Sequence, residues 1–348
     1  MTNRERFAAA IKGAKPDRIP YLIYGGHVTD ANYHSWAPFI ERGLCVMPRV
    51  KGVKETAPDV TETVENFYDA RSGYNVERRT IRTPAGEISR LSHDGWVREY
   101  FVKSPCDYAV IEYILRNTAL APDFDDFYGH EAKIGDAGVT IVRAERSPLQ
   151  KIIVDYAGLE NFSYHMADAP ATVDGTVEVL NDYLKRYYAV LAGHPSAYIQ
   201  IPENLTSEQS GPARYKKYHM PFYEMVVAAF RGANKKLFAH YDGKIACLAE
   251  LITETGLDGV ESFTAPPEGD LTYADARRIM PDMIIMANIG LSDYFLPPDE
   301  LKKKIAGFIE CAAPDGRGLI FEISEDLPVK WSESIPVVLD AIESRASI

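Results

Sequence analysis

Cysteines are few in this chain and long apolar runs are absent, and each lack excludes a class of protein. The four cysteines among 348 residues lie far apart, and none forms a Cys-x-x-Cys pair. This spacing argues against a disulfide framework and against a zinc finger built from thiolates. No apolar run approaches the roughly 20 residues of a membrane span, and the first residues lack the apolar core of a signal peptide. We therefore expect a cytoplasmic protein with no membrane partner.

Basic residues are in the minority. The chain has 38 Lys and Arg against 50 Asp and Glu, which gives a net charge of −12. Proteins that bind nucleic acid neutralise phosphates with stripes of Lys and Arg, and none is visible here, so we expect no nucleic-acid partner. The chain also lacks a Gly-x-Ser-x-Gly elbow and a phosphate-binding glycine loop, which disfavours nucleophilic hydrolysis and nucleotide binding.

What the chain does have is a repeated alternation of short apolar strands with amphipathic helices. After a first strand at 18–24, the pattern predicts strands at 139–142, 197–201, 236–240, 259–263, 283–287 and 319–323. Such alternation indicates a parallel sheet. The length suits a (β/α)8 TIM barrel that forms a single domain over residues 1–348. An open doubly wound sheet is the alternative, but no Gly-x-Gly-x-x-Gly turn follows the first strand.

Residues 76–102 have a different character. Residues 76–83 and 87–91 alternate in polarity and are separated by the turn residues Pro84, Ala85 and Gly86. A further strand is expected from residue 96. This pattern is typical of antiparallel hairpins. We interpret the segment as an antiparallel hairpin insertion in the barrel.

The most informative motif is His240-Tyr241-Asp242, at the end of the strand at 236–240. Side chains two residues apart project from the same face of a strand, so His240 and Asp242 should point together. The carboxyl ends of barrel strands are where chemistry is placed. A histidine and a carboxylate suit a metal such as zinc. The structural alternative is that the pair only caps the following helix.

Other polar residues follow neighbouring strands and should share the same rim. They are Glu203, Glu261, Asn288, and Glu322 or Glu325. We predict that Glu261 and Asn288 orient a substrate. A further set could touch it, with packing as the alternative role for each aromatic member: Tyr24, His27, Tyr241 and Glu325. His219 lies between Glu203 and His240 among aromatic residues, where a packed core histidine is the more common outcome than a metal ligand.

The chain resembles the uroporphyrinogen decarboxylase superfamily. The resemblance is carried by the opening segments 3–7 and 16–20, by Thr83-Pro84-Ala85-Gly86-Glu87, and by the strand and helix around His240. It implies a (β/α)8 barrel. True decarboxylases have an arginine-rich loop after the first strand, which holds an acidic tetrapyrrole. Here the loop at 25–30 contains no arginine, which disfavours that reaction.

Two methyltransferase branches of the superfamily provide comparisons. Those acting on thiols bind zinc through His-x-Cys and a later Cys, whereas this chain has His240-x-Asp242 and Ser324-Glu325 at those places. The chain is more similar to the aryl-ether O-demethylases, which use a Glu…Glu…His zinc set. Glu203 and His240 match the first and last members of that set. His219 or Asp242 would complete it.

The resemblance thus implies a zinc-dependent methyltransferase that moves a methyl group from a small methylated substrate to a corrinoid protein. The favoured substrate is an aryl methyl ether, because zinc could stabilise the poor oxygen leaving group. The corrinoid (cobalamin) would be supplied by the partner protein, and a homo-oligomer is allowed. Three alternatives stay open: transfer from a methylcorrinoid to an acceptor, metal-free tetrapyrrole decarboxylation, and a non-catalytic barrel that binds a ligand or a corrinoid protein.

Overall fold

The structure is a computed structural model that describes residues 1–323 and 326–345. The chain divides into two compact units. The first consists of residues 1–52, 123–144 and 194–348, and the second of residues 53–122 and 145–193. The single domain expected over 1–348 remains a prediction.

The first unit is built on a parallel sheet of nine strands in the order β2-β1-β15-β14-β13-β12-β11-β10-β3. All neighbouring pairs in this sheet are parallel. The strands are β1 (Tyr21–Tyr24), β2 (Leu44–Met47), β3 (Arg49–Val50), β10 (Ile141–Arg143), β11 (Tyr198–Ile201), β12 (Lys236–His240), β13 (Gly259–Phe263), β14 (Ile284–Asn288) and β15 (Leu319–Ile323).

The sheet closes into a ring because β2 and β3 are two parts of one segment, separated only by Pro48. β2 pairs with β1 and β3 pairs with β10, so the nine strands occupy eight positions of a closed barrel. Val139 N donates to Val46 O at 3.0 Å on the closing side. Gly138 stands at this seam, and a Cβ there would lie 1.9 Å from Val46 O. Only glycine therefore lets the two segments approach so closely.

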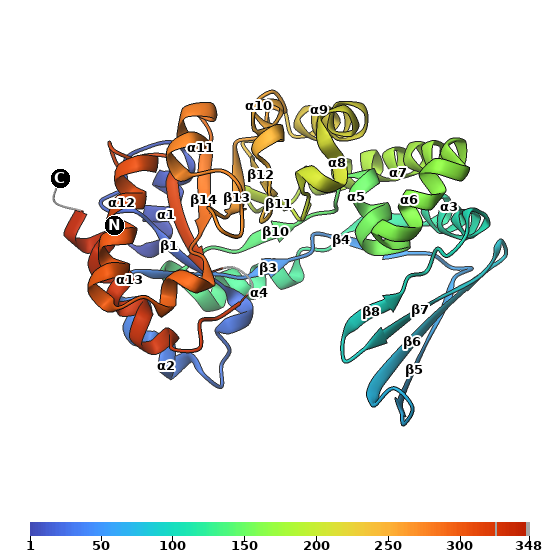
Figure 1. Ribbon diagram of the computed structural model, residues 1–348, viewed down its shortest axis with the longest axis horizontal. Helices are drawn as coiled ribbons and strands as arrows, with labels where there is room; N and C mark the ends of the chain where they lie inside the picture. The colour runs from blue at the N-terminus through green and yellow to red at the C-terminus, as the bar shows by residue number, and fades with distance from the viewer. Residues whose placement is uncertain (324–325, 346–348) are drawn as a thin grey trace. The chain divides into compact units, whose positions relative to one another are not determined.

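Apart from α1 (Asn3–Ile11), which precedes β1, helices of the first unit follow the barrel strands, as the sequence pattern predicts (Figure 1). These helices cover the sheet from outside, as parallel strands require, whereas Phe7, Ala10 and Ile11 of α1 belong to the buried cluster of the barrel interior. The helices that follow the strands are α2 (Tyr33–Arg42), α4 (Asp125–Ile134), α8 (Ser207–Arg214), α9 (Met220–Ala229), α10 (Ala249–Thr253), α11 (Tyr273–Ile279), α12 (Pro298–Ala312) and α13 (Trp331–Arg345). Among the described helices, none combines the length and apolarity needed to cross a membrane.

The barrel interior is apolar at its centre. Its buried cluster is formed mainly by alternate strand residues, which point to the same face of the sheet. These include Leu22, Cys45, Ile141, Phe238, Ile284 and Ile320. Two residues further along the strands, toward their carboxyl ends, polar side chains replace several of the apolar ones. The interior therefore changes from a sealed core to a polar rim.

The second unit contains two antiparallel sheets and several helices. A four-stranded sheet has the order β5-β6-β7-β8, and β4 pairs with β9. The strands are β4 (Val53–Thr56), β5 (Thr61–Asp69), β6 (Tyr74–Thr83), β7 (Gly86–His93), β8 (Trp96–Glu99) and β9 (Ala119–Pro122). The helices are α3 (Tyr108–Asn117), α5 (Pro148–Lys151), α6 (Gly158–Asp168) and α7 (Pro170–Leu191).

The barrel and the antiparallel insertion are both confirmed. The predicted hairpin corresponds to β6 and β7, which are joined at residues 84–85. The insertion is larger than expected, because β5 was not anticipated from the sequence. All but the last of its nine residues are exposed, so β5 lacks the alternation of buried and exposed positions that marks a half-buried strand.

Candidate active site

Polar side chains gather at the carboxyl end of the barrel. Tyr24, Gln200, His240 and Glu322 each lie two residues beyond an apolar interior residue on their own strands. All four are at most 2% exposed. Because side chains two apart share a face, these groups project into the barrel above its apolar core. This is the end at which TIM barrels place their chemistry.

The centre of the site is a pair formed by His240 and Glu261. They are register partners on β12 and β13, and Nδ1 of His240 lies 2.5 Å from Oε2 of Glu261. The hydroxyl of Tyr24 donates to the other oxygen of Glu261 and lies 3.5 Å from Nδ1 of His240. Gln200 Nε2 in turn donates to the Tyr24 hydroxyl at 3.1 Å. Glu261 therefore holds the histidine ring in one orientation.

Charge stabilises this pair despite its burial. Burial alone would lower the pKa of His240, but the charge of Glu261 and the interactions with Asp242 and Glu261 raise it to about 10. Burial would raise the pKa of Glu261, but the positive charge of His240 lowers it below its ordinary value. Opposite charges at this distance each favour the ionised form of the other. The two residues therefore behave as an ion pair inside the barrel.

The pKa of Glu322 is raised, whereas that of Glu261 is lowered. Its Oε1 accepts a hydrogen bond from the backbone N–H of Ser262 at 2.6 Å. Burial and the nearby charge of Glu261 hold the pKa of Glu322 well above its ordinary range. Two carboxylates that share a dry site do not both ionise. Glu322 is therefore a carboxyl group that retains its proton beside the ionised Glu261.

Asp242 connects the histidine to a cavity at the barrel rim. Its Oδ2 lies 3.6 Å from Nε2 of His240 and accepts a hydrogen bond from Asn204 at 3.1 Å. Burial opposes ionisation of Asp242, but its interactions with His240 and Asn204 lower its pKa. The cavity, which we call the mouth cavity, has a volume of about 230 Å³, and its lining includes Asp242, Glu268, Asn288 and Asp326.

Glu203 lies in a second buried network. Tyr223 donates its hydroxyl hydrogen to Glu203 at 3.0 Å. The Tyr223 hydroxyl is also 2.6 Å from that of Tyr241, which lies 3.0 Å from the hydroxyl of Tyr215. All four side chains are buried. A chain of three tyrosines thus supports one carboxylate at the end of β11.

His219 occupies a one-turn π-helix (Tyr215–His219) between α8 and α9. Its Nε2 lies 3.0 Å from Ser210 Oγ, and its ring stacks on Tyr215. Burial lowers the pKa of His219 to about 3. The ring is therefore neutral and packed, and the metal role of His219 stays a prediction.

The predicted zinc ligands do not assemble into a three-donor site. Within residues 1–323 and 326–345, no group of three or more His, Cys, Asp or Glu side chains is arranged to hold a metal ion. His240 and Asp242 nevertheless form a suitable pair. Two tetrahedral ligands with bonds of about 2.0–2.1 Å lie about 3.3 Å apart, close to the 3.6 Å separation of Nε2 and Oδ2. The zinc site with Glu203, His240, Asp242 and His219 therefore stays a prediction.

The residues predicted to contact substrate have diverse positions. Asn288 lines the mouth cavity, and His27 is partly exposed in a short 3-10 helix after β1. Tyr24, Tyr241 and Glu261 are buried within the two hydrogen-bonded networks. Glu325 lies outside the described residues. Direct contact of these residues with a substrate remains a prediction.

Sequence reasoning did not single out Gln200, Tyr223 or Arg49, whose guanidinium carbon lies 3.6 Å from the centre of the Tyr24 ring. The alternation of interior positions could have found Gln200, because it follows Tyr198 by two residues on β11. The same alternation continues from Cys45 and Met47 to Arg49. No local signal marks Tyr223, because a tyrosine in a helix is most often a packing residue.

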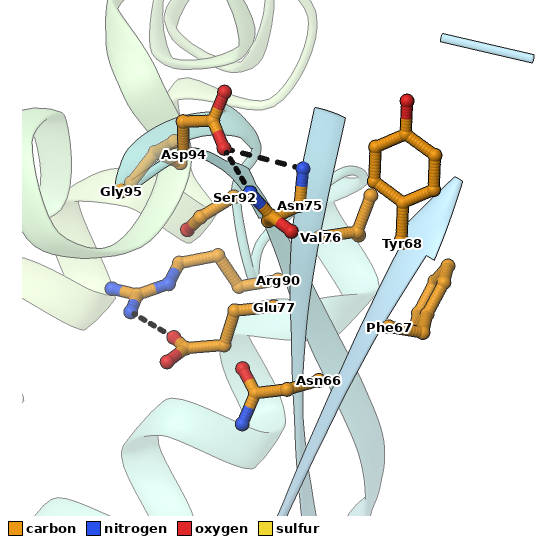
Figure 2. A pocket seen from close by; sticks show the side chains of 11 residues that line it. Asn66, Phe67, Tyr68, Asn75, Val76, Glu77, Arg90, Ser92, Asp94 and Gly95 are labelled. Carbon is orange, nitrogen blue, oxygen red and sulfur yellow. Dashed lines mark hydrogen bonds and ion pairs between the residues drawn. The ribbon is translucent and has the colours of Figure 1, made fainter. Parts of the chain in front are cut away.

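The second unit has a larger cavity of about 700 Å³ on its four-stranded sheet (Figure 2). Its charged side chains contact neighbouring polar groups. Glu77 is ion-paired with Arg79 at 2.7 Å and with Arg90 at 3.7 Å, and Asp94 accepts hydrogen bonds from Asn75. Because these charges already have partners, the barrel end is the stronger candidate for chemistry.

Comparisons with known proteins agree with the barrel. The family described as Uroporphyrinogen decarboxylase (URO-D) matches residues 152–343. The fold is similar to that of a methyltransferase from Methanosarcina mazei, with a TM-score of 0.58, 11% identity and 99% coverage of both chains. At that identity the likeness shows the fold alone. A glycoside hydrolase family 5 enzyme from Prevotella bryantii B14 has a TM-score of only 0.41, with 12% identity and 99% coverage of both chains, and supports no argument.

No curated protein sequence matches the chain. The family match begins in the second unit and ends within α13. It includes β11 to β15 and therefore His240, Glu261 and Glu322. Because the match extends over more than half of the sequence, the chain belongs to the uroporphyrinogen decarboxylase family.

Proposed function

We propose that this protein is a methyltransferase that moves a methyl group from a small methylated substrate to a corrinoid protein. The observation that carries the proposal is the placement of His240 between Glu261 and Asp242. Nδ1 is bonded to Glu261, and Nε2 is turned toward Asp242, which lines the mouth cavity. Family membership and the methyltransferase-like fold support it.

An aryl methyl ether is the proposed donor. Its leaving group is an oxygen anion, which must be stabilised as the methyl–oxygen bond breaks. A cob(I)amide on the partner protein supplies the nucleophile for the methyl carbon. Nε2 of His240 can stabilise the departing oxygen by donating a proton. Glu261 keeps the ring in place, and Asp242 holds Nε2 at the cavity.

Zinc is a further part of the proposal. A zinc ion at Nε2 would replace the proton and supply Lewis-acid stabilisation of the same oxygen. His240 and Asp242 provide one nitrogen and one oxygen donor. The described residues provide no third ligand. A measurement of the metal content therefore tests the proposed zinc role.

The test uses the purified chain with methoxylated aromatic compounds and cob(I)alamin. We expect methylcobalamin to form, as followed by its absorbance, and His240→Gln to slow its formation by about 100-fold or more. His130→Gln is the matched control, because His130 is exposed on α4. Its rate should equal that of the wild type. Absence of transfer from ethers, amines and thiols alike would refute the methyltransferase assignment.

Metal analysis of the same preparations separates the two roles of His240. One zinc per chain that is lost in both His240→Gln and Asp242→Asn supports metal-assisted transfer. Transfer by metal-free protein supports proton donation instead.

A second candidate is decarboxylation of a tetrapyrrole, which membership in the uroporphyrinogen decarboxylase family favours. The loop after β1 contains no arginine to hold the acidic substrate. Release of CO2 from uroporphyrinogen, without methyl transfer, would support this candidate.

A further inference from the structure

Arg49 is an exposed cation at the carboxyl end of the barrel. It begins β3, beside Ile141 on β10. It also continues the alternation of Cys45 and Met47, which both lie in the interior cluster. Its guanidinium carbon lies 3.6 Å from the centre of the Tyr24 ring. The guanidinium therefore lies over the ring of the tyrosine whose hydroxyl contacts Glu261.

Arg49 has no ion-pair partner among the described residues, although its charge acts on the buried Tyr24 and Glu322 nearby. Among the described residues, its guanidinium forms no ion pair or hydrogen bond; its described contact is the Tyr24 ring. The contrast with other arginines of the same unit is clear, because Arg6 is paired with Asp17, Arg18 with Glu343 and Arg42 with Asp340. Arg49 therefore differs from the arginines that stabilise the fold.

The buried acids of the site are engaged with other groups. Glu261 is bonded to His240 and Tyr24, and Glu322 accepts the backbone N–H of Ser262. Neither has a hydrogen bond or ion pair with Arg49 among the described contacts. An exposed guanidinium that has no ion pair among the described residues can bind a ligand at this end of the barrel.

Stacking prepares Arg49 for one class of ligand. A guanidinium that lies on an aromatic ring keeps its N–H groups in the plane, along its edge. That edge matches the two oxygens of a carboxylate, which it binds through paired hydrogen bonds. Ring stacking also reduces the conformational freedom that the side chain would lose on binding.

We propose that Arg49 binds a carboxylate of the substrate and thereby sets which methylated compounds are accepted. The orientation of the substrate in this inference rests on the proposed methyltransferase function. Tyr24 links the two ends, since its ring lies under Arg49 and its hydroxyl is 3.5 Å from Nδ1 of His240. In this proposal the carboxylate of a substrate one aromatic ring in size lies at Arg49 and its methoxy group is directed toward His240.

Calorimetric binding of two probes tests the proposal. Para-methoxybenzoate carries the carboxylate, and para-methoxybenzamide is its neutral counterpart of the same shape. We expect the wild type to prefer the benzoate. Arg49→Gln should weaken benzoate binding by about 10- to 100-fold, the usual range for a lost charged hydrogen bond, and change amide binding by less than about twofold. Arg49→Lys should have an intermediate effect, because it keeps the charge but not the planar fork.

The matched control is Arg231→Gln, in the exposed loop that precedes β12, at the opposite end of the strand from His240. It should bind both probes like the wild type. Thermal unfolding shows whether each variant is folded. If Arg49→Gln is not folded, the binding of the two probes to Arg49→Lys tests the proposal instead.

Several outcomes would overturn the inference. They are no benzoate binding by the wild type at millimolar concentration, equal weakening of both probes by Arg49→Gln, and an effect of Arg49→Gln on cobalamin binding alone. The last outcome would assign Arg49 to the phosphodiester of the corrinoid. Arg49-dependent benzoate binding without methyl transfer would support carboxylate recognition while the methyltransferase proposal fails, so the two failures are distinguishable.

Discussion

His240 and Glu261 come from adjacent barrel strands and meet at 2.5 Å between Nδ1 and Oε2, with both side chains at most 2% exposed. A hydrogen bond to one imidazole nitrogen sets the direction in which the other nitrogen points. Here Glu261 takes Nδ1, so Nε2 is left to face Asp242. The chemistry that we propose for His240 therefore depends on a residue that need not touch the substrate.

Replacement of Glu261 by Gln should destabilise the protein by about 3 kcal/mol, because it leaves a buried histidine without its counter-charge. Urea unfolding at neutral pH measures the change. Glu268→Gln, at an exposed position of the mouth cavity, should stay within about 0.5 kcal/mol of the wild type. The double variant with His240→Gln should lose less than the sum of the single changes, since the two side chains are coupled. Additive losses would contradict the ion pair.

The tyrosine network around Glu203 leads to a separate prediction. Tyr223→Phe removes the hydroxyl that donates to Glu203 and contacts Tyr241. Because a buried carboxylate then loses a donor, unfolding should require about 1–3 kcal/mol less free energy. Tyr128 is 58% exposed, and Tyr128→Phe should be nearly neutral. Equal chemical unfolding curves for the wild type and Tyr223→Phe would show that the network contributes nothing.

His194 should make the stability depend on pH. Its Nδ1 accepts the backbone N–H of Ser196 at 3.0 Å. Burial and the nearby charge of Lys235 lower its pKa to about 4, whereas an unfolded histidine has a pKa of about 6.5. Between these values the unfolded chain binds more protons, so the contribution of His194 is complete above about 6.5 and is lost as the pH falls through about 4.

The variant His194→Asn keeps a hydrogen-bond acceptor but has no titrating ring. The wild type should lose stability relative to this variant as the pH falls from about 6.5 to about 4. Thermal or urea unfolding across that range measures the difference. A constant difference between the two proteins would mean that His194 has an unshifted pKa.

The seam of the barrel predicts a position-specific effect of glycine substitution. Gly138→Ala would put a methyl group 1.9 Å from Val46 O, so we expect a loss of about 2 kcal/mol or more from the forced displacement. Gly175 lies within helix α7 with nothing within 4 Å of an added Cβ. Gly175→Ala should therefore stabilise the chain by up to about 1 kcal/mol. Calorimetric melting of both variants gives the comparison.

Much of the fold could be predicted, because local patterns encode it. The barrel strands around 236–240, 259–263 and 319–323 are short apolar runs between helices, and each was found close to its place. The hairpin of β6 and β7 has a clear turn and alternating strands. β5 could not be found in this way, because exposure on both faces leaves no periodic signal.

The candidate site was predictable in its composition but not in its pairings. Glu261 was expected to orient a substrate, and its described partners are His240 and Tyr24. Glu203 was expected as a metal ligand, and its described partner is Tyr223. The metal role of Glu203 and the absence of a nucleic-acid partner stay predictions, as does the homo-oligomer.

By itself, the sequence determined the (β/α)8 architecture and the presence of His240 and Asp242 at the end of a strand. Both properties depend on the order of residues within a few positions of the chain. The periodicity of apolar and polar residues reveals that order. The tertiary structure alone decided that Glu261 holds His240, that Glu322 keeps its proton and that Arg49 lies on Tyr24. Such contacts depend on the register between strands that are remote in the chain and on burial. Neither can be read from the spacing of residues along one strand.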